Sequence, residues 1–194
     1  RFGGGSRKTM QYFLQRDLRL NPDDELIYEA TWSRNELQVE YTDRVVLLPH
    51  VKKLLDLLKS DGYTLALATM SIKDVVDRIG IYHQIDGYFD VVLTIDDVVK
   101  GKPDPEILTK AVDLLGGQVD RSIYIGDSRH DLEAAVCLGM PFLLADTGVY
   151  VREAARTGLR ATAEMGGYPV VGIEELLDIR EIAGRLGTVE CGED

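Results

Sequence analysis

Short apolar runs alternate with amphipathic segments along most of this chain. From Val51 onward, leucines recur at helical spacing, which predicts a helix ahead of the turn at Asp61-Gly62. Four later runs are short, apolar and rich in branched or aromatic side chains, which is typical of buried strands; they cover residues 63–68, 89–94, 122–125 and 141–145. The chain from residue 45 therefore predicts strands that are separated by helices.

The segments between these runs carry helix start and stop signals. Ser71 and Asp74 have the spacing of a capping pair for a helix over about 72–79, and Asp104 followed by Pro105 predicts the start of the next helix. Gly139 is placed to end a helix over about 129–138. Further elements are expected as helices near 150–157 and 173–186 and a short strand at 170–171. This alternation predicts an α/β fold with a parallel, doubly wound sheet.

The first 44 residues have a different pattern. Met10, Phe13, Leu14 and Leu18 mark one amphipathic helix, and the run 21–24 (NPDD) is a start signal for a second helix that reaches about residue 43. The sequence thus predicts a helical hairpin over 1–44 and an α/β domain over 45–194.

Composition and charge narrow the class of protein. The chain has 194 residues, of which 45% are hydrophobic, and no apolar run approaches the ~18 residues that a membrane helix needs. The formal net charge of −11 disfavours a nucleic-acid partner, because an acidic surface repels phosphates. Two cysteines, Cys137 and Cys191, are too few for a disulfide framework, so we expect a cytoplasmic protein. Cys137 follows Ala134 and Ala135 and is expected in the core.

Chemically active side chains follow the predicted strands. Thr69 comes after the strand at 63–68, Lys102 lies in the loop after the strand at 89–94, and Asp127 and Asp131 follow the strand at 122–125. Since ligands of parallel sheets bind beyond the carboxyl ends of the strands, we expect these groups to meet at one edge. A hydroxyl, a lysine and carboxylates suit phosphate-ester chemistry with Mg²⁺.

These motifs resemble those of the haloacid dehalogenase superfamily, in its helical-cap branch with phosphoglycolate phosphatase and β-phosphoglucomutase. The likeness covers about residues 1–180 and lies in four segments: LALAT ending in Thr69, KGKPDPE around Lys102, IYIGDSRHDLEAA with Asp127 and Asp131, and LLPHVKKLL with His50 where glycine is usual. This resemblance implies a Rossmann-like core under a small cap. It also implies that the protein is a hydrolase that uses Mg²⁺.

The resemblance also implies roles for single residues. Thr69 and the Met70 N–H would bind phosphoryl oxygens, and Lys102 would stabilise the nucleophile and the phosphoryl charge. Asp127 would ligate Mg²⁺, and Asp131 would ligate it through water or hold Lys102. Met70 departs from the polar residue that commonly follows the threonine.

Two of these residues have a plainer alternative. Ser128 and Asp131 also have the spacing of a capping box for the helix that follows. Arg7, after Gly-Gly-Ser, resembles an arginine that reaches the distal anion of a sugar phosphate, but a solvent-facing arginine is the favoured interpretation.

One family motif has no counterpart in this sequence. The nucleophile and the general acid of the family form an Asp-x-Asp motif at the end of its first strand, and the sequence contains no Asp-x-Asp. That strand would lie between those at 63–68 and 122–125. Because residue 1 is Arg, we expect an incomplete sequence, and we expect the 194-residue chain to be inactive; a non-catalytic relative, or one that another chain completes, is the alternative.

The function expected from the whole sequence is a Mg²⁺-dependent phosphatase that acts on a small phosphorylated metabolite through an aspartyl-phosphate intermediate. A β-phosphoglucomutase-like mutase shares the motifs and stays open. A true haloacid dehalogenase needs no Mg²⁺ and is disfavoured by Asp127 and Asp131. A regulator that binds a phosphometabolite or a protein partner is the alternative of another class. No pattern in the sequence indicates an oligomeric state.

Overall fold

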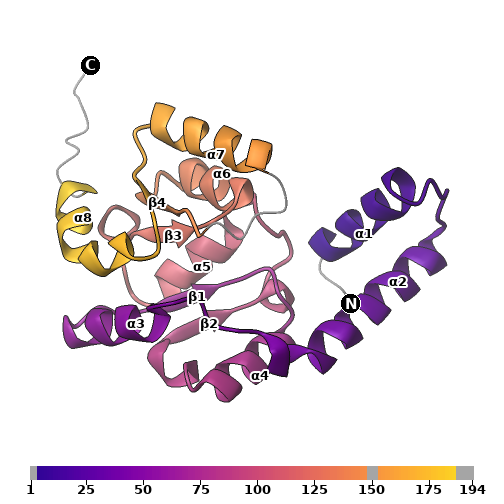
Figure 1. Ribbon diagram of the computed structural model, residues 1–194, viewed down its shortest axis with the longest axis horizontal. Helices are drawn as coiled ribbons and strands as arrows, with labels where there is room; N and C mark the ends of the chain where they lie inside the picture. Colours follow the sequence, from indigo (N-terminus) through magenta and orange to yellow (C-terminus); the bar gives the residue numbers. More distant parts are fainter. Residues whose placement is uncertain (1–3, 148–152, 187–194) are drawn as a thin grey trace.

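Helices and strands alternate along the core as the sequence predicts. The computed structural model describes residues 4–147 and 153–186. Its strands are β1 (Ala66–Ala68), β2 (Val91–Leu93), β3 (Tyr124–Gly126), β4 (Phe142–Ala145) and β5 (Val170–Val171) (Figure 1). Its helices are α1 (Gly4–Arg16), α2 (Asp24–Glu40), α3 (Val51–Ser60), α4 (Lys73–His83), α5 (Glu106–Leu114), α6 (Arg129–Leu138), α7 (Glu153–Met165) and α8 (Ile179–Leu186).

All described strand pairs are parallel, but they form two sheets. β1 pairs with β2, with Ala66 opposite Val91. β4 lies between β3 and β5, with Tyr124 opposite Phe142 and Leu144 opposite Val170. β1 and β3 therefore each have one partner among the described strands. The break between the sheets falls where the resemblance predicts a further strand.

Helices cover both faces of these sheets. One buried cluster joins α5 and α6 to β2 and β4, around Ile107, Leu132 and Phe142. A second cluster, on the other side of β4, includes Leu143 and Ile179 and extends to Leu54 of α3. Figure 1 shows the resulting layers, with α3 and α8 on one side of the strands and α5 and α6 on the other. The carboxyl ends of β1 and β3 lie close together, because Lys102 contacts both Ala68 at the end of β1 and Asp131 beyond the end of β3.

The α1–α2 hairpin stands beside the α/β core (Figure 1). Asp23 starts α2 by accepting a hydrogen bond from the Leu26 N–H at 2.9 Å, as the NPDD signal predicts. α1 packs on α2, which also contacts α4. A domain boundary between residues 44 and 45 stays a prediction. None of the described helices is both long and apolar enough to cross a bilayer.

Several expected boundaries shift. The helix expected at 150–157 is α7, which extends to Met165 because Leu159 and the fully buried Ala163 continue its apolar face. The helix expected at 173–186 begins as a 3₁₀ turn at Glu175–Asp178 and becomes α-helical only from Ile179. α2 ends at Glu40 and not near residue 43, and a 3₁₀ turn follows at Thr42–Arg44.

The capping pair expected at Ser71 and Asp74 is wrong. Ile72 holds the N-cap position of α4 and makes no side-chain cap. Asp96, from the loop after β2, accepts a hydrogen bond from the Lys73 N–H at 2.9 Å instead. The spacing signal fails here because a residue distant in sequence supplies the acceptor.

Candidate active site at the carboxyl ends of the strands

The strand ends bring two of the expected side chains, Lys102 and Asp131, into one hydrogen-bond network. β1 leads directly to Thr69, β3 leads to Asp127, and the loop after β2 carries Lys102. The Lys102 side chain reaches across the break between the two sheets and connects β1 with β3 and α6. Its Nζ donates to the Ala68 carbonyl of β1 at 3.1 Å and contacts Tyr124 of β3 and Asp131 of α6.

Lys102 and Asp131 form a buried ion pair. Nζ of Lys102 lies 2.6 Å from Oδ1 of Asp131, and the two side chains are 8% and 7% exposed. The Tyr124 hydroxyl lies within hydrogen-bond distance of both, 2.7 Å from Nζ and 2.6 Å from Oδ1. Because a buried charge without its partner is strongly destabilising, removal of either charge alone would cost about 3–5 kcal/mol.

The second oxygen of Asp131 organises the turn after β3. Oδ2 accepts hydrogen bonds from the Ser128 N–H at 3.0 Å and the Asp127 N–H at 3.3 Å, and the Ser128 side chain caps the Asp131 N–H in return. This is the capping box that the sequence allowed as the plainer alternative. Asp131 thus caps α6 and holds Lys102 at the same time.

The charge of Asp131 is maintained despite its burial. Burial alone would raise the pKa of this carboxyl, but the Lys102 ammonium and the hydrogen bonds from Ser128 and Tyr124 outweigh it and hold the pKa below its ordinary range. Asp131 is therefore an anion that compensates Lys102 inside the protein.

Two glycines permit this close packing. A Cβ on Gly126 would lie 2.5 Å from the Cβ of Asp131 and 3.0 Å from the Phe142 ring. A Cβ on Gly101 would lie 3.1 Å from the sulfur of Met70. Glycine is therefore required before Asp127 and before Lys102 in the two motifs. A larger residue at Gly126 would collide with Asp131, and one at Gly101 would collide with Met70.

Thr69 and Met70, which directly follow β1, hold the turn after this strand and the lysine loop. The Thr69 N–H donates to the Leu93 carbonyl at 3.0 Å, and its hydroxyl accepts from the Ser71 N–H at 3.2 Å. The Met70 sulfur accepts from the Lys102 N–H at 3.0 Å. Met70 therefore uses its side chain to support the lysine loop, whereas its N–H remains the group proposed for phosphate.

Asp127 is exposed at the carboxyl end of β3. The described residues contain no group of three or more His, Cys, Asp or Glu side chains placed to hold a metal ion. This donor set fits a cation held by one or two carboxylates together with water and phosphate oxygens, as Mg²⁺ is, and does not fit a fully protein-ligated metal. Arg7 belongs to α1, but its side chain lies outside the described part of the structure.

Sequence reasoning missed two residues of this network. The sequence pattern predicts Tyr124 only as part of a strand, although its spacing of two from Gly126 puts its side chain on the face where Asp131 lies. The sequence patterns predict no structural role for Glu106, yet it closes the lysine loop by accepting from the N–H groups of Val99 at 3.0 Å and Lys100 at 2.8 Å.

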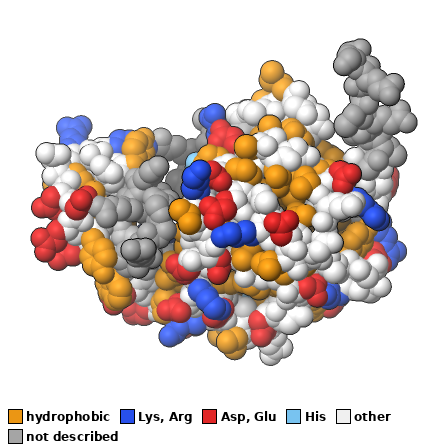
Figure 2. All heavy atoms as spheres, turned by 180° about the vertical axis from the view of Figure 1, so that it is seen from behind, with side chains coloured by type: hydrophobic (Ala, Val, Ile, Leu, Met, Phe, Trp, Pro, Cys, Tyr) orange, Lys and Arg blue, Asp and Glu red, His pale blue; other side chains and the backbone are white. Residues whose placement is uncertain are grey.

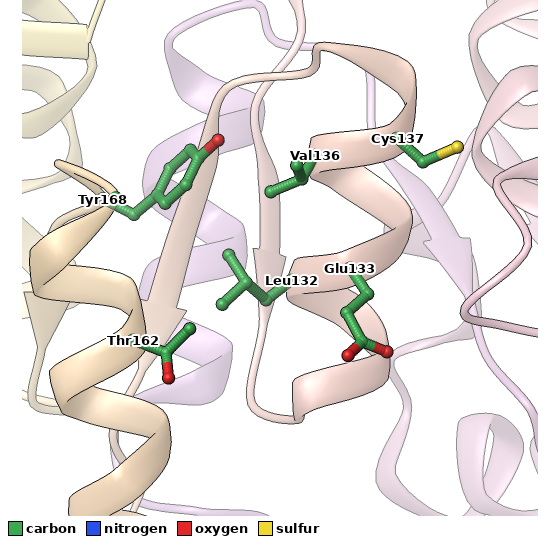
Figure 3. A pocket seen from close by; sticks show the side chains of 7 residues that line it. Leu132, Glu133, Val136, Cys137, Thr162 and Tyr168 are labelled. Atoms are coloured by element: carbon green, nitrogen blue, oxygen red, sulfur yellow. The ribbon is translucent and has the colours of Figure 1, made fainter.

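A separate cavity of about 480 Å³ lies between α6 and α7 (Figure 3). Its lining is largely apolar and includes Leu132, Val136 and Tyr168, and none of the expected site residues lines it. Cys137 also lines this cavity and is exposed, so its expected place in the core is wrong. The α6 face that carries Ala134 and Ala135 is the buried one.

The cation of the site is internal. On the face shown in Figure 2, Lys and Arg side chains are interspersed with Asp and Glu side chains over the surface. Lys102, in contrast, is 8% exposed and compensated by Asp131. The net charge of −11 is therefore compatible with a local anion site, because that site does not depend on a basic surface.

Comparison with known proteins gives one family. A sequence profile described as haloacid dehalogenase-like hydrolase matches residues 4–145. A curated relative, the pyrophosphatase PpaX of Bacillus cereus (strain AH820), is 32% identical over 111 residues, which are 57% of this chain and 51% of the relative. The chain thus spans about half the length of the curated relatives it matches.

Solved structures share the fold. A phosphonoacetaldehyde hydrolase-like protein from Oleispira antarctica aligns with a TM-score of 0.74 at 18% identity, covering 97% of this chain and 79% of the other. A β-phosphoglucomutase from Clostridium difficile aligns with a TM-score of 0.68 at 17% identity, covering 91% and 78%. At these identities the likeness concerns the fold alone.

Proposed function

Because the chain belongs to the haloacid dehalogenase-like hydrolase family, we propose that it carries the phosphate- and metal-binding part of a Mg²⁺-dependent phosphomonoester hydrolase. Its substrate would be a small phosphorylated metabolite. The observation that carries the proposal is the network that joins Lys102 to the end of β1, to Tyr124 of β3 and to Asp131 of α6. The curated relative, which is named as a pyrophosphatase, supports a phosphorylated substrate.

Each side chain has a defined task in this proposal. The Thr69 hydroxyl and the Met70 N–H bind phosphoryl oxygens, and Lys102 neutralises the charge that these oxygens share with the attacking group. Asp127 would hold Mg²⁺, which neutralises negative charge on the phosphoryl group so that an anionic nucleophile can approach it. For Asp131, its contacts favour a positioning task over direct ligation of the metal, because both of its oxygens already accept hydrogen bonds.

The nucleophile must come from an Asp-x-Asp segment that these 194 residues do not contain. We propose that a strand bearing this segment pairs between β1 and β3, where each has a single partner among the described strands. The aspartyl-phosphate intermediate that the family resemblance implies would then form within reach of Lys102. The chain by itself would bind phosphate and not turn over.

A turnover assay tests whether this chain lacks the nucleophile. With p-nitrophenyl phosphate and Mg²⁺, the 194-residue chain should release no nitrophenol above background. Turnover that the Asp127→Asn substitution abolishes would contradict the proposal, because it would require a nucleophile within this chain. Asp127→Asn is a suitable variant because residue 127 is exposed, so that the change perturbs packing little.

A further inference from the structure

Tyr124 completes a triangle of hydrogen bonds with the two charges of the site. Its hydroxyl accepts from Nζ of Lys102 at 2.7 Å and donates to Oδ1 of Asp131 at 2.6 Å, while Nζ and Oδ1 are themselves 2.6 Å apart. A phenol has one donor and an acceptor oxygen, so a single hydroxyl serves both partners. This arrangement fixes the ammonium in direction as well as in distance.

All three donors of the Lys102 ammonium have an acceptor. They are the Asp131 carboxylate at 2.6 Å, the Tyr124 hydroxyl at 2.7 Å and the Ala68 carbonyl at 3.1 Å. An ammonium has no fourth donor, so it must exchange one of these bonds to contact a phosphoryl oxygen. The bond to Ala68 is the longest and is made to a neutral carbonyl, which makes it the easiest to exchange.

We propose that Tyr124 is a positioning residue for Lys102. Together with Asp131 it fixes two of the three N–H groups of the ammonium, so that the third N–H group can exchange its hydrogen bond to the Ala68 carbonyl for one to a phosphoryl oxygen. The Ala68 carbonyl acts as a temporary acceptor while no phosphate is bound. This inference rests on the proposed function, since it assigns the phosphate-binding task to Lys102.

The surroundings of Tyr124 suit this task. Its ring packs against the fully buried Phe142 at 5.9 Å between centroids, so the hydroxyl has a fixed location. Burial raises the pKa of the Tyr124 phenol, and the neighbouring Asp131 adds to the effect. The phenol therefore stays protonated and keeps donating to Asp131.

The test compares Tyr124→Phe, which removes only the hydroxyl, with Tyr168→Phe, which removes a hydroxyl outside the network. The first readout is the ¹⁵N NMR signal of the Lys102 ammonium, measured without phosphate. This signal is resolved when the ammonium is ordered and its protons exchange slowly with water. We expect this signal in the unmodified chain and in Tyr168→Phe, and we expect it to be lost in Tyr124→Phe. Its persistence in Tyr124→Phe would overturn the proposal.

The second readout is the affinity for inorganic phosphate with Mg²⁺, measured by calorimetry. Loss of one positioning hydrogen bond should weaken binding by about tenfold in Tyr124→Phe and leave Tyr168→Phe unchanged. Unaltered affinity in Tyr124→Phe would overturn the positioning role. If the unmodified chain binds no phosphate, the proposed function fails, and the phosphate-dependent part of this inference fails with it, while the ammonium signal separately decides whether Tyr124 orders Lys102.

A measurement on the unmodified chain covers the case in which Tyr124→Phe does not fold. Addition of phosphate should shift the ¹³C resonance of the Ala68 carbonyl as its hydrogen bond is released, while the Lys102 ammonium signal persists. An ammonium signal that is absent without phosphate, or an Ala68 carbonyl that does not respond to bound phosphate, would overturn the proposal.

Discussion

At the scale of single residues, Asp131 joins local folding to the chemistry of the site. One of its oxygens accepts from the turn that starts α6, and the other holds Lys102. The same carboxylate therefore stabilises a helix and positions a cation. A sequence signal that is fully explained by helix capping can thus mark a functional residue, since the two roles use different oxygens.

His50 gives a prediction about backbone strain. It precedes α3 with a φ of 66° and no side-chain cap, a conformation that costs a residue with a Cβ about 1–2 kcal/mol relative to glycine. His50→Gly should therefore raise the free energy of unfolding by about 0.5–1 kcal/mol, after its extra entropy in the unfolded chain is counted. Chemical denaturation measures the change.

The matched control for this prediction is His50→Ala. Alanine removes the imidazole but keeps the strain, so it should give no gain in stability. An equal gain from both substitutions would show that the imidazole and not the backbone is responsible.

The residues that sequence reasoning identified are those with local signals. Gly139 ends α6 with a φ of 67°, and Ser128 and Asp131 cap its start, as their spacing predicts. Tyr124 was missed and Cys137 was misplaced, because their roles depend on what packs against β3 and α6 from other parts of the chain. Local spacing does not contain that information.

At the scale of elements, the lysine loop is held by the first residue of α5. Glu106 accepts from the N–H groups of Val99 and Lys100 and pairs with Lys110 at 3.0 Å. These interactions, the Val99 bond first, lower the pKa of Glu106 from 4.5 to about 2. These hydrogen bonds connect the loop that carries Lys102 to the start of α5.

A pH titration tests the hydrogen bonds that Glu106 accepts from the lysine loop. Since the pKa of Glu106 is lower in the folded chain than in the unfolded chain, its stabilising contribution is complete above about pH 4.5 and is lost as the pH falls towards 2. The amide resonances of Val99 and Lys100 should shift with a midpoint near pH 2, and Glu106→Gln should abolish this response. A midpoint near 4.5 in the folded chain would show that the two hydrogen bonds do not form.

Element types were easier to predict than element ends. The strand runs at 89–94 and 141–145 became β2 and β4, because Leu93 of β2 and the whole of β4 are buried whatever packs on them. The end of α7 and the capping residue of α4 were wrong, since they depend on contacts of Ala163 and on Asp96. Tertiary contacts decide these boundaries.

At the scale of the whole molecule, the two sheets differ in how completely their strands are covered. All four residues of β4 are buried and the strand is paired on both sides, whereas β1 and β3 are half-buried with one described partner each. Strand order and the break between the sheets cannot be predicted from local sequence patterns. The resemblance to a family was needed to expect a strand at that place.

Amide hydrogen exchange measures this difference. Amides of Leu143 and Leu144 in β4 should exchange at least about tenfold more slowly than those of β1, because the open edge allows local opening at lower cost. Addition of a peptide that pairs between β1 and β3 should raise the protection of both strands. Equal protection of β1 and β4 in the chain alone would show that the edge of β1 is already covered.

In the proposed site, Thr69, Lys102 and Asp127 surround one phosphate and one divalent cation. Mn²⁺ in place of Mg²⁺, added with inorganic phosphate, broadens the NMR signals of nearby amides. The broadening should centre on the amides of Met70, Asp127 and Ser128 and should disappear in Asp127→Asn. Broadening that centres on the acidic helix α2, or that Asp127→Asn leaves unchanged, would contradict the account.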